Sequence, residues 1–387
     1  ASLRRIDTRR PLAAMALGQS VDPTDAGRPG RTLDDASRGP MDQPHADLLR
    51  ELFFSLLLEL AEASHLRVAF LATWPNAMPS MGCLSVDCDT PEYGHLYALQ
   101  QTLSMTGSRA TLFCSPAAYG ADLYRHFKTL RQEVGLLIGD LDTPDHLQER
   151  IHIQLANLQR ISANPGIHVA RTVNGTWIGR TKLPQAAEAA GIRVLSCRGP
   201  YSARMSGFPF GTALPFDPSP SLTSSPRMLE LPFQVSEPGV VTPNDSVEPI
   251  LEETVRRGGL CQVSARASCI QDPAGLSGLR RWLSLTRHLG VRVLSLDSVA
   301  VFTRARLSVG AEVTVSGELR LFTDTVVPGL CLLVSGSAIH EAGSDPSVHP
   351  VRMRRFGTEL TSLPLDLQAH RSTNLRLVPW SGGSLAA

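Results

Sequence analysis

Two aspartates at the end of a short apolar segment are the residues best suited to chemistry in this chain. Residues 83–89 read CLSVDCD, which predicts a strand over 83–88 that presents Asp87 and Asp89 at its end. Side chains at positions i and i+2 of a strand point to the same face. Functional groups gather beyond the carboxyl ends of parallel strands. One carboxylate there can take a proton while the other holds a metal ion. The alternative, that a strand-end Asp only caps the next helix, stays open at this point.

The cysteines indicate buried thiols rather than a metal centre. They are Cys83, Cys88, Cys114, Cys197, Cys261, Cys269 and Cys331. No C-x-x-C pair is present, which excludes a zinc ribbon. Cys88 lies between the two aspartates, so its side chain should face the opposite side of the strand and not act as a nucleophile. Free thiols favour a reducing, cytoplasmic location.

Alternating strand and helix patterns run from residue 66 to residue 305. Strands are predicted at 83–88, 110–115, 134–138, 168–171, 192–197, 260–265 and 291–296, and the clearest helices at 146–161, 182–190 and 276–289. Repeated alternation of this kind indicates an α/β fold with parallel strands and helices outside. By this pattern alone, a β/α barrel and a doubly wound sheet fit equally well.

The flanking regions differ from this core. Residues 1–45 show little apolar periodicity, so we expect a mobile tail. Residues 46–64 carry leucines at helical spacing and predict a leading helix that packs on the main domain, which would span 46–305. After residue 306 the pattern predicts a small all-β appendage over 306–387, with strands at 312–322, 329–338, 363–367 and 374–380.

Composition excludes several functional classes. The net charge is +1 in 387 residues, so there is no whole-chain attraction to nucleic acid or to an anionic membrane. The longest strongly apolar run covers only residues 52–58, whereas a membrane-spanning helix needs roughly 20 residues.

Further segments follow the aspartate strand in a recognisable order. They read ATLF at 110–113, EVG at 133–135, HVAR at 168–171 with Trp177 after it, EAAGI at 188–192, and GGL at 258–260. Together they resemble the motifs of the polysaccharide deacetylases, also called the NodB-homology domain or carbohydrate esterase family four. The resemblance covers about residues 66–305 and implies a distorted (β/α) barrel.

The same resemblance implies roles for individual residues. Asp87 would be the general base, and Asp89 would bind a divalent metal, commonly zinc, together with two histidines. Arg171 would orient or tune the base. Trp177 would stack on a sugar ring, although a buried structural Trp is the commoner case.

The chain departs from this family where the metal should bind. Leu137 and Leu141 occupy the expected histidine positions, and the late histidine is absent from the stretch CQVSAR at 261–266. Leucine has no lone pair for zinc, so we expect no cofactor unless zinc binds a set rebuilt from other ligands, such as His95 and His126.

The sequence therefore predicts a polysaccharide deacetylase-like pseudoenzyme that binds a carbohydrate or another N-acyl ligand. The alternative is an active hydrolase of carbon–nitrogen (non-peptide) or ester bonds that deacetylates a glycan with Asp87 as base. The β appendage could dock a protein partner.

Overall fold

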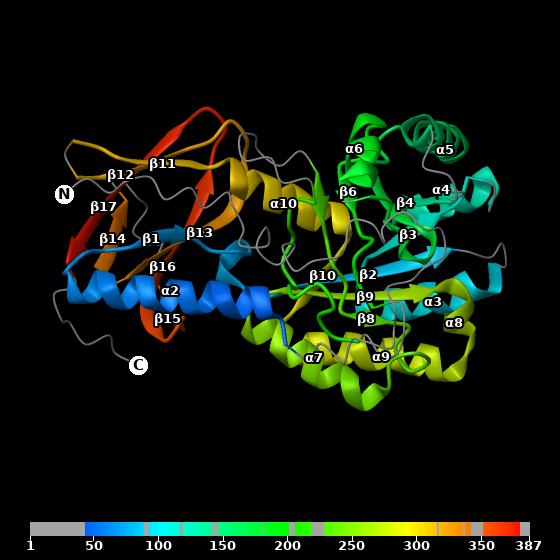
Figure 1. Ribbon diagram of the computed structural model, residues 1–387, viewed down its shortest axis with the longest axis horizontal. Helices are drawn as coiled ribbons and strands as arrows, with labels where there is room; N and C mark the ends of the chain where they lie inside the picture. Colours follow the sequence, from blue (N-terminus) through cyan, green and yellow to red (C-terminus); the bar gives the residue numbers. More distant parts are fainter. Residues whose placement is uncertain are drawn as a thin grey trace. The chain divides into compact units, whose positions relative to one another are not determined.

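The structure is a computed structural model that describes residues 43–88, 93–116, 119–139, 141, 146–179, 181–200, 206–218, 228–315, 317–335, 337–341 and 351–379. These residues form two compact units. The barrel unit contains residues 43–47 and 79–300, and the β unit contains residues 48–78 and those from 301 onward (Figure 1).

A parallel sheet forms the centre of the barrel unit. Its strands are β2 (Met81–Cys88), β3 (Ala110–Cys114), β4 (Glu133–Ile138), β5 (Val169–Thr172), β6 (Val194–Leu195), β7 (Leu229–Glu230), β8 (Val235–Ser236), β9 (Leu260–Arg266) and β10 (Arg292–Leu294). The order is β7-β6-β5-β4-β3-β2-β9-β8. The first half of β2 also pairs with β10, and its second half pairs with β3. The predicted strand alternation is confirmed.

One short segment joins the two ends of this sheet. β7 pairs with β6 and β8 pairs with β9, and both belong to the continuous stretch 229–236. Between them, the Phe233 amide donates to the Arg198 carbonyl at 2.9 Å, and the Gln234 amide donates to the Gln262 carbonyl at 3.1 Å. The segment 229–236, called here the closing segment, thereby closes the sheet into a distorted (β/α) barrel. The predicted fold class is confirmed.

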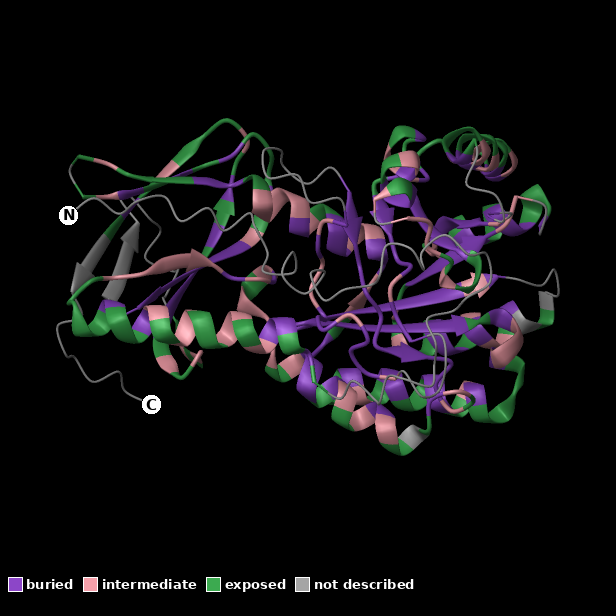
Figure 2. Ribbon diagram, in the orientation of Figure 1, coloured by how far each residue is buried: buried purple, intermediate pink, exposed green. Residues whose placement is uncertain are grey.

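Helices cover the outer face of the barrel. They are α3 (Tyr93–Thr106), α4 (Ala121–Thr129), α5 (Leu147–Ser162), α6 (Lys182–Ala189), α7 (Asn244–Arg256), α8 (Ala267–Gln271) and α9 (Pro273–His288). Alternate residues of each strand point outward into their apolar layer. On β2 these are Leu84, Val86 and Cys88, which join one cluster with the buried stripe of α5. Cys88 therefore faces away from Asp87, as the strand period requires. Figure 2 shows the strands of the barrel as almost entirely buried.

Inward-facing positions are different at the carboxyl end of the strands. There the alternation on β2 and β9 places Ser85, Asp87, Gln262 and Ser264 inside the barrel, and Arg171 enters from β5. The barrel interior is thus polar at its carboxyl end. The outward-facing residues of the same strands are apolar.

The β unit holds two antiparallel sheets. Its strands are β1 (Ala69–Leu71), β11 (Gly310–Val313), β12 (Leu319–Phe322), β13 (Val327–Ser335), β14 (Ser337–Glu341), β15 (Val351–Arg355), β16 (Thr358–Leu367) and β17 (Ser372–Pro379). The sheet orders are β1-β13-β16-β15 and β11-β12-β17-β14. The predicted single strand at 312–322 is a hairpin, because Gly317 adopts a positive φ of 81° and turns the chain.

The structure changes two expectations for the flanking regions. β1 pairs with β13, so residues 48–78 belong to the β unit rather than to the barrel. The barrel unit also ends inside α10 (Leu296–Ser308), at residue 300 and not at 305. We predicted a mobile tail over residues 1–45. Residues 1–42 of that tail lie outside the described residues.

The leading helix α2 (His45–Ala63) is the clearest correction. We expected its leucine stripe to be buried, but Leu58 and Ala61 on the opposite face are buried instead, at 1% and 5% exposure. On that face Phe54 stacks on Phe356, with ring centroids 5.0 Å apart. An amphipathic pattern shows that a helix has two faces. It does not show which of two apolar faces meets the neighbouring strands.

The structure also bears on the predicted burial of the cysteines and on membrane-spanning helices. Six of the seven cysteines are buried, Cys269 is half-buried, and all are free thiols. Among the described residues, no helix combines the length and the apolar composition that crossing a bilayer requires.

Candidate functional site

The structure brings Asp87 and Arg171 together at the carboxyl end of the barrel. An Arg171 Nη1–H donates to Asp87 Oδ1 at 2.9 Å, and the two side chains are 0% and 15% exposed. A buried guanidinium needs a counter-charge, since an isolated buried charge is very costly. Asp87 supplies that charge from β2, which is separated from β5 in the sheet by β4 and β3. The ion pair therefore spans the barrel interior.

Hydrogen bonds use all five N–H groups of Arg171. Besides Asp87, they reach Ser85 Oγ at 2.7 Å, Ser264 Oγ at 2.6 Å, Ser196 Oγ at 2.8 Å and the Ser196 carbonyl at 2.6 Å. A guanidinium has exactly this number of donors, which leaves none for a ligand unless an existing bond breaks. Arg171 is therefore a group that fixes its neighbours, in particular the Asp87 carboxylate.

Two aromatic rings lie against the guanidinium of Arg171. Its central carbon lies 4.5 Å from the ring centre of Phe113 and 4.9 Å from that of Phe233. Two glycines make room for these rings. A Cβ at Gly135 would stand 2.8 Å from Phe113, and one at Gly199 would stand 2.3 Å from Phe233. The stacked rings add a cation–π attraction and prevent the guanidinium from turning.

The structure describes only part of the predicted zinc site. Leu137 and Leu141 are buried, at 4% and 8% exposure, and carry no donor atom. Asp89 lies outside the described residues, and the side chain of His95 does as well. His126 bonds to Gln100 at 3.1 Å on the exposed surface of α4. Within the described residues, no three His, Cys, Asp or Glu side chains converge as a metal site requires. Among the described residues, the side chains at the two expected histidine positions do not fit zinc, which favours imidazole and thiolate ligands.

Trp177 lies beyond the end of β5 with a cation on its ring. The guanidinium carbon of Arg198 is 3.7 Å from the ring centre of Trp177 and 4.8 Å from that of Phe210. Trp177 is half-buried and also packs against the apolar layer. One face of its ring is thus already covered, so a sugar could stack only on the remaining surface.

Glu230 of β7 fixes the backbone that carries Arg198. Its Oε1 accepts the amides of Cys197 and Arg198, both at 2.7 Å, while its Oε2 is buried without a hydrogen-bond partner. Burial raises the pKa of Glu230 to about 7, and the two amides and the Arg198 charge act in the opposite direction. A neutral carboxyl group is therefore well populated at neutral pH.

A second charged cluster lies at the amino end of the same barrel. Glu133 begins β4 and accepts hydrogen bonds from the Thr111 hydroxyl and, at 3.2 Å, from the Asp297 amide. His168 Nε2 lies 2.6 Å from Asp297 Oδ1 and its Nδ1 lies 2.6 Å from the Gly166 carbonyl. Burial raises the pKa of Glu133 to about 7, and the hydrogen bond to Asp297 raises the pKa of His168. Because both ring nitrogens of His168 face acceptors, the protonated form fits this position best.

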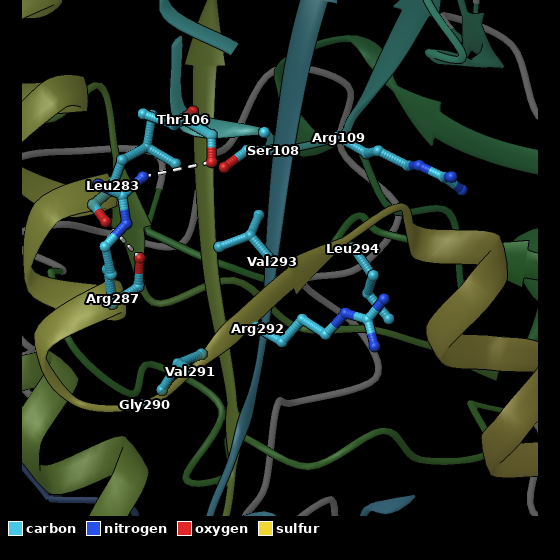
Figure 3. Close-up of a pocket in the computed structure, with 12 residues that line it drawn as sticks. Thr106, Ser108, Arg109, Leu283, Arg287, Gly290, Val291, Arg292, Val293 and Leu294 are labelled. Atoms are coloured by element: carbon cyan, nitrogen blue, oxygen red, sulfur yellow. Dashed lines mark hydrogen bonds between the residues drawn. The ribbon is translucent and has the colours of Figure 1, made fainter. Parts of the chain in front are cut away.

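Two cavities open at this amino end of the barrel. One of about 350 Å³ is lined by Glu133, His168 and Asp297 among others. The other, of about 420 Å³, is lined by the residues drawn in Figure 3. Arg287 donates there to the Thr106 carbonyl at 3.3 Å, at the end of α3, while Arg109 and Arg292 point away from Arg287. These arginines do not converge, so the second cavity is not a built anion site.

Sequence reasoning identified Asp87 and Arg171 but missed the groups that hold them. Ser85, Phe113 and Ser264 lie in the segments CLSVDCD, ATLF and CQVSAR, but their contact with Arg171 was not predicted, and Ser196 and Phe233 belong to none of the quoted segments. A signal was nevertheless present: Ser85, Gln262 and Ser264 are polar residues at alternate positions of otherwise apolar strands. Such positions indicate a polar barrel interior.

Comparisons with known proteins give matches only among solved structures, since no protein-family profile and no curated protein matches the chain. A protein assigned as a polysaccharide deacetylase from Mycobacterium smegmatis is 12% identical, with a TM-score of 0.48, over 61% of this chain and 94% of that one. A pseudoenzyme of carbohydrate esterase family four from Bacillus anthracis is 10% identical, with a TM-score of 0.35, over 57% and 65% of the two chains.

A family 4 acetyl xylan esterase from Clostridium thermocellum, in complex with cobalt, is 12% identical, with a TM-score of 0.38, over 57% of this chain and 91% of that one. The family that the sequence motifs indicated is thus the family of these structural matches.

Proposed function

We propose that this protein binds a carbohydrate or another N-acyl ligand at the carboxyl end of the barrel and does not hydrolyse it. In this proposal the chain is a polysaccharide deacetylase-like pseudoenzyme. The resemblance of the ordered motifs supports the ligand class. The Asp87–Arg171 pair carries the argument against hydrolysis.

That pair opposes a role of Asp87 as general base. A carboxylate that is neutralised by a buried guanidinium has little drive to accept a proton. The guanidinium cannot move away, because its other donors bind three serines and its faces contact two rings. Asp87 is therefore held as one half of a structural ion pair.

The positions of Leu137 and Leu141 oppose metal-assisted chemistry. Two buried leucines stand where the family motif provides imidazoles, and Leu141 packs in the apolar layer between the sheet and the helices. Without a metal ion to polarise an acetamide or to activate water, neither half of the hydrolytic step is catalysed. Binding through shape, hydrogen bonds and stacking remains compatible with such a site.

The test measures binding and turnover on the same samples. Isothermal titration with chitotetraose and with acetylated xylotetraose reports binding, and mass spectrometry of the ligand after incubation with added zinc reports deacetylation. We expect binding of one of the two ligands without loss of acetyl groups. Trp177→Ala should weaken that binding about tenfold, whereas Tyr97→Ala, an exposed aromatic control on α3, should not change it.

Two outcomes would contradict the proposal. Deacetylation that disappears in Asp87→Asn would establish the alternative, an active hydrolase with Asp87 as base. If neither binding nor turnover were detected, the proposal that the barrel binds a carbohydrate would be wrong. As a converse test, Leu137→His combined with Leu141→His should give zinc uptake by elemental analysis, while Leu137→His alone should not.

A further inference from the structure

Helix α2 exposes a continuous apolar stripe in the β unit. Its residues are Leu49, Leu52, Phe53, Leu56 and Leu60, with exposed fractions of 57%, 56%, 52%, 50% and 66%. Residues 49, 53, 56 and 60 follow the 4-3-4 spacing of a helix that packs along another apolar segment. Five large apolar side chains gathered on one helix face indicate an interaction surface rather than scattered surface residues.

The border of this stripe is acidic. At about 100° per residue, Glu59 lies beside Leu52 at one edge of the stripe, and Glu62 lies about 60° further around the helix; both are exposed. The whole helix carries Asp47, Glu51, Glu59 and Glu62 against Arg50, a net charge of −3. The last turn contains no basic residue that would interact favourably with the helix C-terminus. The surface therefore suits an occupant that is both apolar and basic.

These properties argue against a second copy of α2 as the occupant. Two helices of charge −3 repel each other. Half-exposed side chains of this size would each bury roughly 50 Å², so the two stripes together would bury about 500 Å². A stable interface between separate molecules needs roughly 1,000 Å². A segment tethered to the same chain needs less area, because the tether removes most of the entropy cost of association.

The beginning of the chain has the required composition. Residues 1–17 contain four arginines and one aspartate, a net charge of +3, together with Leu3, Ile6, Leu12, Met15 and Leu17. Residues 18–42 connect this segment to the described chain, which starts next to α2. These 25 residues can span up to about 80 Å, whereas α2, with its 19 residues, is only about 28 Å long.

We propose that residues 1–17 of this chain cover the exposed stripe of α2. Their apolar side chains would lie on Leu49, Phe53, Leu56 and Leu60, and their arginines would face Glu59 and Glu62. The proposal is independent of the proposed ligand at the barrel.

Thiol labelling at the centre of the stripe tests the proposal in the full chain. Leu56→Cys adds a thiol there, and Ser104→Cys on the exposed surface of α3 is the reference for an open position. We expect a bulky maleimide to label Leu56→Cys at least tenfold more slowly than Ser104→Cys, as measured by mass spectrometry of peptides. When Arg5→Glu, Arg9→Glu and Arg10→Glu are added to Leu56→Cys, its labelling should become as fast as that of Ser104→Cys.

Matched variants test whether the effect on labelling depends on the arginines of residues 1–17 or on the net charge of the whole chain. Arg28, Arg31, Arg38→Glu changes the same number of arginines outside residues 1–17 and should leave labelling slow. Adding Glu59, Glu62→Arg to the Arg5, Arg9, Arg10→Glu chain should restore slow labelling. Equal labelling of the two cysteines in the otherwise unchanged chain would overturn the proposal. So would a dimer in sedimentation whose dissociation accompanies fast labelling, since the occupant would then be a second copy.

Discussion

The two ends of the barrel hold charged clusters of opposite character. At the carboxyl end, the Arg171 guanidinium is fully buried, uses every donor and meets the Asp87 carboxylate. At the amino end, Glu133, His168 and Asp297 share hydrogen bonds beside a cavity, and the pKa values of Glu133 and His168 are raised. The same parallel strands therefore carry one cluster that is locked and one that exchanges protons near neutral pH.

The difference follows from the kind of cation present. A guanidinium stays charged at every physiological pH and has rigid, forked donors that several acceptors can saturate. An imidazole changes its charge between pH 5 and 8. The carboxyl end thus contributes a fixed structure, while the amino end makes the stability of the barrel depend on pH.

Removal of the fixed cation should have the largest effect. Arg171→Met keeps an unbranched side chain beside the two rings but removes the guanidinium from Asp87 and from the three serines. Ser85 keeps its bond to the Val263 carbonyl, and Ser196 keeps its bond from Gln262. We expect a loss of about 3–5 kcal/mol in the free energy of unfolding, measured with urea, because a partly buried carboxylate loses the buried cation that neutralises it.

Two variants check this interpretation. Adding Asp87→Asn to Arg171→Met should recover part of the loss, since the side chain at position 87 then carries no charge that needs a buried cation. Arg109→Met, an exposed arginine at the other end of the barrel, should change stability by about 0.5 kcal/mol or less. If both arginine variants lost the same free energy of unfolding, the Asp87–Arg171 pair would contribute no more to stability than an exposed arginine does.

Neutralising Glu133 should have the next largest effect, and it should appear only at higher pH. Folding raises the pKa of Glu133 from 4.5 to about 7, so its contribution to stability is fully present below pH 4.5 and is lost as the pH rises through 7. Glu133→Gln cannot ionise. At pH 8 it should remove a penalty on the order of 2–3 kcal/mol and flatten the stability profile between pH 4.5 and 7.

The difference between two glutamate variants isolates this effect from other titrating groups. Glu248→Gln changes an exposed glutamate and should leave the pH profile of the unchanged chain intact. If Glu133→Gln followed that same profile, the amino-end cluster would not titrate as the geometry indicates.

The smallest effect is expected for the histidine of the amino-end cluster. The pKa of His168 is raised above 6.5, so its pairing with Asp297 stabilises the fold below that pH and the benefit is lost as the pH rises through the raised pKa. His168→Gln should cost about 1 kcal/mol or less at pH 6, because the paired side chains are 32% and 31% exposed, and almost nothing at pH 9. A cost that is independent of pH would show that only the shape of the ring matters.

The sequence predicted the local elements well and the long-range ones poorly. The strands at β2, β3, β4 and β9 follow from runs of apolar residues that both faces of a barrel sheet require. The closing segment was not predicted, because each of its strands has only two residues and Pro232 lies between them. Its conformation depends on pairing with β6 and β9, which no local pattern contains.

The same limit applies to the site. The order of motifs placed Asp87 and Arg171 at one end of the barrel, since both follow or end parallel strands. It could not give the number of hydrogen bonds to Arg171, because Ser85 on β2, Ser196 after β6 and Ser264 on β9 are distant in sequence. Whether a carboxylate is a catalytic base or half of a structural pair depends on such partners.

The closing segment also has a consequence for the kinetics of folding. It bonds to β6 on one side and to β9 on the other, and β9 in turn pairs with β2 about 180 residues away in sequence. Contacts between such distant residues form slowly, because long loops must close first. We therefore expect residues 229–236 to acquire protection from amide exchange late in refolding, after β2, β3 and β4, and to be the place where the native barrel first opens.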